Sequence, residues 1–381
     1  MTGLRFVLAM WVVLHHLVGP GGILEPQFRT LTPSLQALVG SGYLAVETFF
    51  ILSGFVLARS YESVAKWSRK DLKRFAMARF ARVYPIFALS MLVMSPFIVE
   101  TLAKPGRTGV EKAEVLGQYL FLLIGWLTPR GVGWNTPAWS LSCEFFFYAC
   151  FPLLFLWLRN ASPRRLYAVF AASFVLPIIL LHTGVPFVWK PIHSLPDFIT
   201  GIVAAKLFER TRTTNRGYRL YIPALIAATL LIPHPEVLKG TYIDLPTALI
   251  PFNVVILIGF AMNGGWIARI LSTRVADYLG QASYSMYILH VPVLWWYTRY
   301  AFHKLGPWPH TGASVAYLIV VVIVSIAAFE LVEKPVNRWL RDWTSRRLSA
   351  ARRTPVPLRP GFETPAAPYS PVSVPAASES A

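Results

Sequence analysis

The stretch GYLAVETFFILSGFVLARS, residues 42–60, is almost entirely apolar. Its length is close to the roughly 20 residues that a helix needs to cross the hydrocarbon layer of a membrane. Comparable runs recur along most of the 381 residues, and 55% of the chain is hydrophobic while only 14% is charged. Soluble domains usually carry about 25% charged residues. We therefore expect an all-α, polytopic membrane protein.

The apolar runs predict about ten transmembrane helices. They cover residues 4–19, 42–60, 83–101, 139–158, 166–182, 194–208, 220–233, 245–263, 282–302 and 313–333. An eleventh run, 114–128, is shorter and leads into the irregular stretch Gly131–Pro137. Irregular backbone at membrane depth is tolerated only where it is buried in protein or lines a wet cavity. We read 114–138 as a re-entrant or interfacial segment.

The formal net charge of +18 lies mainly in the short connections between apolar runs. This placement is typical of membrane topology signals and argues against a nucleic-acid partner. The strongest cytoplasmic marker is the basic segment 59–82. If 114–138 does not cross the membrane, the later basic loops and both termini are cytoplasmic. We expect a multi-pass protein of the bacterial inner membrane.

The chain divides into one membrane domain and a tail. We assign residues 1–334 to the integral membrane domain. Residues 335–381 form a basic tail that is rich in Pro, Ala and Ser, and we expect it to be cytoplasmic and disordered. Such a composition cannot bury enough apolar surface to fold.

Two ionisable residues of the first apolar run share a helix face. Arg5 and His16 are separated by a spacing that brings them to nearly the same face, about 16 Å apart along the axis. Ionisable groups inside membrane spans are costly and are functional candidates by default. With Arg5 at the inner surface, His16 lies toward the outer half. The alternative is that Arg5 only anchors the helix and His16 is an interfacial residue.

Two carboxylates are expected near His16. Glu47 lies in an aromatic run, and Glu144 lies at the outer end of its own helix. The predicted topology places His16, Glu47 and Glu144 at similar depth, where a carboxylate could orient the histidine as a general base. Ser53, next to Gly54, permits a close helix contact, and its alternative reading is packing alone.

Arg79 and Arg82 are neighbours at i,i+3 where the third helix enters the membrane. Two guanidinium groups there could grip a phosphate bidentately. Lys73 and Arg74 precede them. The alternative reading is a topology signal or contact with anionic lipids.

A later cluster repeats polar side chains every three residues. Tyr284, Tyr287 and His290 share one rough helix face, and His290 falls near the middle of the membrane. The alternative reading is a packed histidine whose hydrogen bonds are satisfied.

Together these residues resemble the membrane acyltransferase-3 family. The matching segments follow in the family's order: Arg5 with His16; residues 42–55; Arg79-x-x-Arg82-Val-Tyr-Pro; Trp139-Ser140-Leu-Ser-x-Glu144; and Gly280-x-x-Ser-Tyr284-Ser-x-Tyr287-x-x-His290-x-Pro292. The resemblance spans residues 4–292. We expect no extracellular hydrolase-like domain after the membrane part, unlike in fused members.

The resemblance implies an O-acyltransferase, of O-acetyltransferase type. Its donor would be cytoplasmic acetyl-CoA or another acyl-CoA, and its acceptor a hydroxyl of an exopolysaccharide or other cell-envelope glycan, which can be lipid-linked. His16 would be the general base or carry the acyl group, oriented by Glu144 or Glu47. Arg79, Arg82, Arg5, Lys73 and Arg74 would hold the donor.

The same resemblance implies no metal and no permanently bound cofactor. The implied partners are the lipid bilayer, acyl-CoA, the glycan and polysaccharide-assembly proteins. Two other functions stay open: a transporter or flippase of a lipid-linked glycan, and an acyltransferase for an antibiotic or lipid acceptor. The absence of internal repeats weakens the transporter reading.

Overall fold

The computed structural model describes residues 1–19, 22–105, 108–127, 133–183, 190–211, 216–239, 241, 243–262, 264–301 and 310–350. Within these ranges every regular element is helical, which confirms the all-α class. The α-helices are α1 Thr2–Val18, α2 Glu25–Phe28, α3 Pro33–Gly40, α4 Leu44–Ser60, α5 Arg69–Ala103, α6 Gly109–Leu120, α7 Trp139–Arg159, α8 Pro163–His182, α9 Lys190–Phe208, α10 Tyr218–Leu231, α11 Leu245–Ala261, α12 Trp266–Leu271, α13 Arg274–Trp296, α14 His310–Ala328 and α15 Lys334–Ala350.

Short helices of other types join these elements. Two 3₁₀ turns, η1 Thr136–Ala138 and η2 Pro235–Leu238, precede α7 and α11. Two π-helical turns, η3 Tyr297–Ala301 and η5 Phe329–Glu333, follow α13 and α14. Such π-turns are rare and often occur at functional sites.

Four helical segments within the described residues are long and apolar enough to cross a membrane: Arg69–Ala103, Thr136–Arg159, Pro163–Leu180 and Gly312–Leu340. The pair α3 and α4, bent by 44°, could add a fifth. The expected count of about ten is not confirmed. Several apolar helices are short: α1 has 17 residues, about 26 Å of helix against a hydrocarbon core of about 30 Å.

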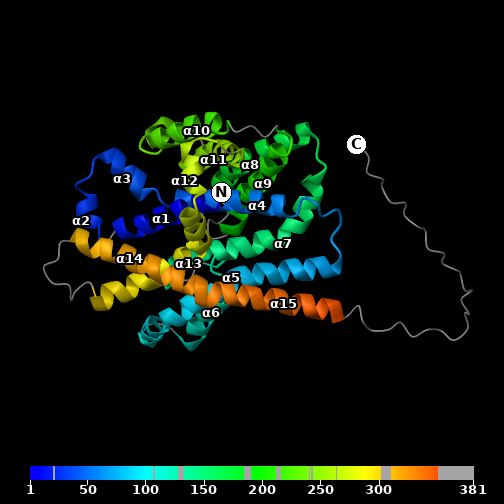
Figure 1. Ribbon diagram of the computed structural model, residues 1–381. Helices are drawn as coiled ribbons and strands as arrows, with labels where there is room; N and C mark the ends of the chain where they lie inside the picture. Colours follow the sequence, from blue (N-terminus) through cyan, green and yellow to red (C-terminus); the bar gives the residue numbers. More distant parts are fainter. Residues whose placement is uncertain are drawn as a thin grey trace, which may run out of the picture.

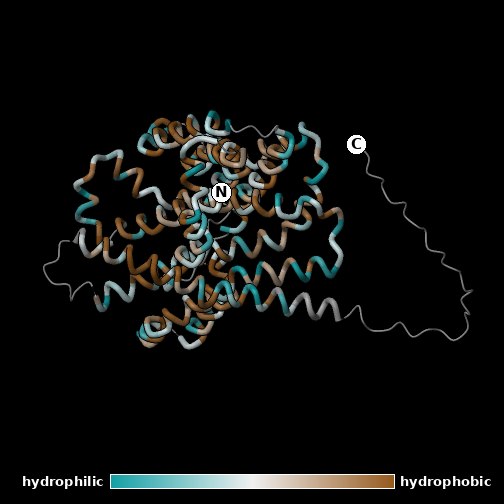
Figure 2. Tube along the Cα trace, in the orientation of Figure 1, coloured by the Kyte–Doolittle hydropathy of each residue, from teal (hydrophilic) through white to brown (hydrophobic). Residues whose placement is uncertain are grey.

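Helix α5 begins in the basic segment that precedes the third apolar run. Ser68 and Asp71 form a reciprocal capping box at its N-terminus, which satisfies two of the free backbone amides there. The helix then continues for 35 residues, about 52 Å, which exceeds the hydrocarbon thickness. Its first turns are hydrophilic in Figure 2, so the basic residues sit on a rigid extension of a membrane helix.

The centre of the bundle is built on close contacts between α4 and α9 and between α1 and α13. A Cβ atom at Gly54 would lie 2.1 Å from the carbonyl oxygen of Phe198, and one at Gly201 would lie 1.9 Å from that of Ile51. Glycines therefore let α4 and α9 touch through their backbones, as small residues do in membrane bundles. The packing reading thus holds for Gly54, while its neighbour Ser53 faces a cavity.

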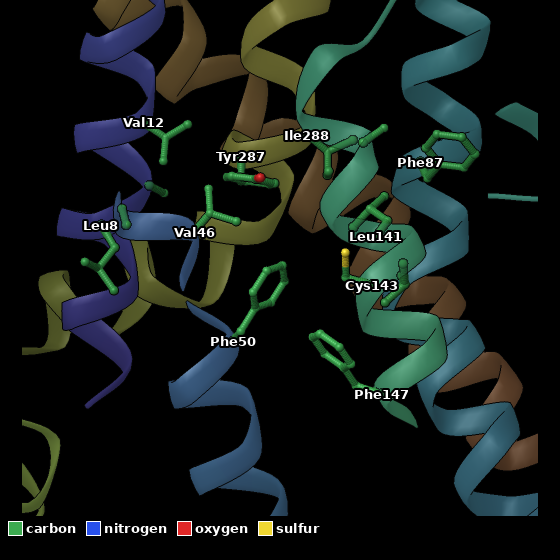
Figure 3. Packing of buried hydrophobic residues seen from close by; sticks show 14 of the residues in the cluster. Leu8, Val12, Val46, Phe50, Phe87, Leu141, Cys143, Phe147, Tyr287 and Ile288 are labelled. Atoms are coloured by element: carbon green, nitrogen blue, oxygen red, sulfur yellow. The ribbon is translucent and has the colours of Figure 1, made fainter. Parts of the chain in front are cut away.

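Figure 3 shows the rings of Phe50 and Phe147 pointing toward one another among other buried apolar side chains. The ring of Phe50 meets the edge of Phe147 with centroids 5.1 Å apart, and Phe147 stacks on Phe198 at 5.0 Å. Such pairs add to the burial of apolar area. They tie α4, α7 and α9 into one core.

The segment predicted as re-entrant, 114–138, is only partly helical. Helix α6 ends at Leu120 after 12 residues, about 18 Å, which is too short to span. Residues 128–132 lie outside the described residues. Beyond them the buried amide of Asn135 donates to Ser90 Oγ at 3.0 Å and to the carbonyl of Ile288 at 3.1 Å. Whether the segment enters the membrane stays a prediction.

The tail predicted to be disordered includes residues that are helical in the structure. Residues 335–350, expected to be disordered, form most of α15. Figure 1 shows α15 continuing from α14 and running beside α5, with which it packs. The packing against α5 is the reason that this charged segment can be helical. Residues 351–381 lie outside the described residues.

Candidate active site

A cavity of about 300 Å³ opens between α1, α4, α5, α7 and α13. Along α4 its lining runs from Val46 to Ser60, a length of about 21 Å. Its polar lining residues are Arg5, Ser53, Ser60, Arg79, Arg82, Ser140, Glu144, Tyr148, Ser283, Tyr284 and Tyr287. The cavity therefore joins residues from every matching segment of the sequence.

Three guanidinium groups, those of Arg5, Arg79 and Arg82, gather in one part of the cavity. The guanidinium of Arg79 lies over the rings of Phe75 and Tyr148, 5.7 Å from each centroid. Its Nε is buried and has no hydrogen-bond partner among the described residues. An unpaired buried donor is costly, so this group is available for an anionic ligand.

Arg82 is held in place by a residue that sequence reasoning missed. Its Nη1 pairs with Glu333 Oε1, and Ser285 Oγ donates to the other oxygen, Oε2, at 2.7 Å. Glu333 ends the π-turn η5 and is fully buried. The sequence signal for Glu333 was a carboxylate at the end of the last apolar run. Because Lys334 follows it, the residue resembles one that marks the boundary of a membrane helix.

The predicted cluster residue Tyr284 supports the same arginine. Its ring lies under the guanidinium of Arg82, 5.2 Å from the centroid. Its hydroxyl donates to the carbonyl of Val83 at 2.6 Å. Tyr284 thus couples α13 to α5 at Val83.

Glu144 lies at the arginine part of the cavity. Its carboxylate is within electrostatic range of Arg5, Arg79 and Arg82 and within hydrogen-bonding range of Tyr148. Three cations therefore face one cavity-lining carboxylate, Glu144, and a second carboxylate, Glu333, that is buried behind Arg82. The surplus positive charge suits an anion with several oxygens, such as a phosphate.

The opposite part of the cavity carries hydroxyl groups. Tyr287 donates to Ser140 Oγ at 3.0 Å, and Ser140 donates to the carbonyl of Pro137 at 2.9 Å. Trp139 packs beside them against Phe50 at 6.0 Å, and the amine of Lys190 lies 4.4 Å from its ring centroid. Lys190 was not singled out from the sequence.

Next to Tyr287 lies a pair of histidines from α1 and α13. The rings of Tyr287 and His290 are 6.1 Å apart, and His290 Nε2 lies 3.4 Å from His16 Nδ1. His15 turns away, with its Nδ1 2.5 Å from the carbonyl of Gly40. His16, not His15, therefore pairs with His290, and both rings of the pair lie behind the lining residue Tyr287 rather than in the cavity wall itself.

The family described as an acyltransferase domain matches residues 1–330, most of the chain. The chain belongs to this acyltransferase family. It is therefore an enzyme that transfers acyl groups. No solved structure matches it.

Several proteins resemble this acyltransferase along different shares of their length. Acyltransferase MdmB of Streptomyces mycarofaciens is 28% identical over 97% of this chain and 96% of its own. "Protein 2 in picA locus" of Rhizobium radiobacter is 29% identical over 47% of this chain and 92% of its own. The "Putative O-acetyltransferase" of Staphylococcus aureus strain COL is 24% identical over 77% of this chain, which spans 50% of that protein.

The predicted meeting of His16, Glu47 and Glu144 does not occur in this acyltransferase. Glu144 faces the arginines, and Glu47 faces Asp197 and Asp244 on the far side of α4. Glu47 is not among the residues that line the cavity. The topology argument estimated depth along each helix but could not estimate rotation about its axis.

Lys73 and Arg74 are also separate from the arginine cluster. Lys73 is exposed, and Arg74 lines a second cavity of about 390 Å³ with Tyr61, Trp67 and Phe75.

Within the described residues no group of three or more His, Cys, Asp or Glu side chains is arranged to hold a metal ion.

Proposed function

We propose that this acyltransferase moves an acyl group, of acetyl size, from cytoplasmic acyl-CoA to a hydroxyl of an exopolysaccharide or other cell-envelope glycan. The observation that carries the proposal is one cavity with three arginines in one part and Tyr287, beside the histidine pair, in the other. Phosphates of the donor suit the arginines, and a long arm suits a cavity about 21 Å long. No permanently bound cofactor is needed.

The chemistry requires a base for the acceptor hydroxyl. His16 Nε2 removes the hydroxyl proton, and the oxygen attacks the thioester carbonyl. The carbon–sulfur bond then breaks, and the proton moves from His16 to the departing thiolate of CoA. General acid–base help of this kind contributes about 10²–10⁴ in rate.

The proposal places the protein in the bacterial inner membrane with both termini in the cytoplasm. Arg79 and Arg82 follow the most basic segment of the chain, 59–82, and basic segments favour the cytoplasmic side. This orientation would present the arginines to cytoplasmic acyl-CoA. The lipid bilayer and polysaccharide-assembly proteins are the partners that it implies.

A second candidate acceptor is an antibiotic or a lipid. Acyltransferase MdmB matches the chain along almost the whole length of both proteins. This match supports acyl transfer that is completed within a membrane domain of this length. The Staphylococcus aureus relative, of which the chain spans half, has room for further domains. Either acceptor would use the same donor site.

Deletion of the gene followed by mass spectrometry separates these functions. We expect the glycan ester content to fall to background and to return with the wild-type gene but not with His16→Ala. His182→Ala, on the exposed end of α8, is a matched control and restores the esters. Normal glycan esters with an unacylated secreted small molecule or lipid would favour the second acceptor. Loss of exported glycan with unchanged esters per sugar would favour a transporter.

A further inference from the structure

The contact between His16 and His290 has a defined hydrogen-bond direction. His16 Nδ1 lies 2.9 Å from the carbonyl oxygen of Val12, and His290 Nδ1 lies 2.7 Å from that of Tyr287. Carbonyl oxygens only accept hydrogen bonds. Both Nδ1 atoms must therefore carry the hydrogen in the neutral rings, which leaves both Nε2 atoms with a lone pair.

The two lone pairs have different surroundings. His16 Nδ1 shares its one hydrogen between the carbonyl oxygen of Val12 at 2.9 Å and, more weakly, the lone pair on His290 Nε2 at 3.4 Å. His16 Nε2 has no hydrogen-bond partner among the described residues. The Val12 carbonyl thus sets the tautomer of His16 whose free Nε2 can accept a proton, and the His290 contact supports it from the side chain.

His290 is held rigidly enough to orient the His16 ring. The residue is fully buried, and its backbone carbonyl accepts a hydrogen bond from Tyr317 at 2.8 Å. No carboxylate of the described residues pairs with either ring. The ionisable ring neighbours are His15 beside His16 and Tyr287 beside His290. A neutral orienting group avoids burying a carboxylate inside a membrane protein.

We propose that His290 is the positioning residue for His16, in the place where other acyl-transfer sites use a carboxylate. The proposal rests on the proposed function, in which His16 is the base. The proton of the acceptor hydroxyl goes to His16 Nε2 and then to the thiolate of CoA, while His290 gains no proton. Its lone pair stabilises the imidazolium of His16 between these two steps.

Substitutions at His290 separate positioning from packing. In His290→Gln the amide oxygen can still accept from His16 Nδ1, whereas His290→Leu and His290→Met fill the space without an acceptor. We expect kcat to fall about 10²-fold in the apolar variants and to be largely restored in His290→Gln. The KM for acyl-CoA should not change, because the arginines are untouched. A packing role predicts the opposite order, with Leu and Met tolerated better than Gln.

Tyr297→Phe is the matched control, because it removes a buried tyrosine hydrogen bond, to the carbonyl of Ala313 at 2.6 Å, and touches neither histidine. It should lower thermal stability and leave kcat unchanged. Apolar variants with the kcat of the wild type, or Gln and Leu variants with equal kcat, would overturn the positioning role while His16→Ala is still inactive. Full activity of His16→Ala would overturn both the role of His16 as the base and the positioning role of His290.

Discussion

At one end of the cavity Arg82 is paired with the buried carboxylate of Glu333, whereas behind Tyr287 at the other end His16 faces a second neutral imidazole. The arginine end carries formal charges that compensate one another only in part, with three arginines against Glu144 and Glu333. The histidine end is held by neutral hydrogen bonds to backbone carbonyls. This difference indicates that donor binding and proton transfer depend on separate groups of residues. Loss of an arginine should disturb charge balance, and loss of a histidine should disturb chemistry.

The largest expected effect is on chemistry at the histidine end. His16→Ala should lower kcat by about 10²–10⁴ because it removes the general base. The KM for acyl-CoA and the thermal stability should stay close to the wild type, since the arginine end is intact. Steady-state kinetics with purified protein and acetyl-CoA measure both constants. A variant whose KM rises while kcat holds would place the histidine in donor binding instead.

The next effect is on stability at the arginine end. Arg82→Ala leaves Glu333 buried without its partner, and breaking such a pair costs about 3–5 kcal/mol. Thermal unfolding in detergent should show a clear loss of stability. The double variant Arg82→Ala/Glu333→Gln should recover much of it, because no charge is then left unpaired. Wild-type stability of Arg82→Ala would mean that the pair does not hold the helices.

A smaller effect is expected on donor affinity. Arg79→Ala removes an unpaired donor from the cavity, and a charge-assisted hydrogen bond is worth about 1.5–3 kcal/mol, roughly tenfold to a hundredfold in KM for acyl-CoA. Its kcat should change little. Arg74→Ala is the matched control, because Arg74 lines the second cavity. Equal effects of the two variants would show that the cluster is not a specific donor site.

The smallest effect concerns the carboxylate that belongs to neither end. Glu47→Gln should leave kcat and KM at wild-type values, because Glu47 faces Asp197 and Asp244 and does not line the cavity. Neutralising it also relieves repulsion among these acids, so stability should not fall. A large loss of kcat in a well-folded Glu47→Gln variant would return this residue to the site.

Much of the fold could be predicted from the sequence because apolar length is a local property. Each of the ten predicted runs lies mainly in a helix. The count of crossings could not be predicted with the same success, since α1, α10 and α11 are short and other helices extend well past the apolar run. The disorder predicted for 335–350 was wrong, because the contact of α15 with α5 is tertiary.

The candidate site divides in the same way. The spacing of Arg5 and His16 and of Arg79 and Arg82 could be read from the chain, because helix geometry relates residues a few turns apart. Glu333 could not be found in this way, because it meets Arg82 across 251 residues. Glu47 was misplaced because its depth was known but its facing direction was not.

The sequence by itself determined that the protein is a bundle of apolar helices with an acyltransferase pattern of polar residues. Composition and short-range spacing carry that information. Only the tertiary structure decided which polar residues meet. His16 and His290 are 274 residues apart and touch because α1 packs on α13. The rotation of each helix is set by contacts such as those of Gly54 and Gly201, and no local pattern specifies it.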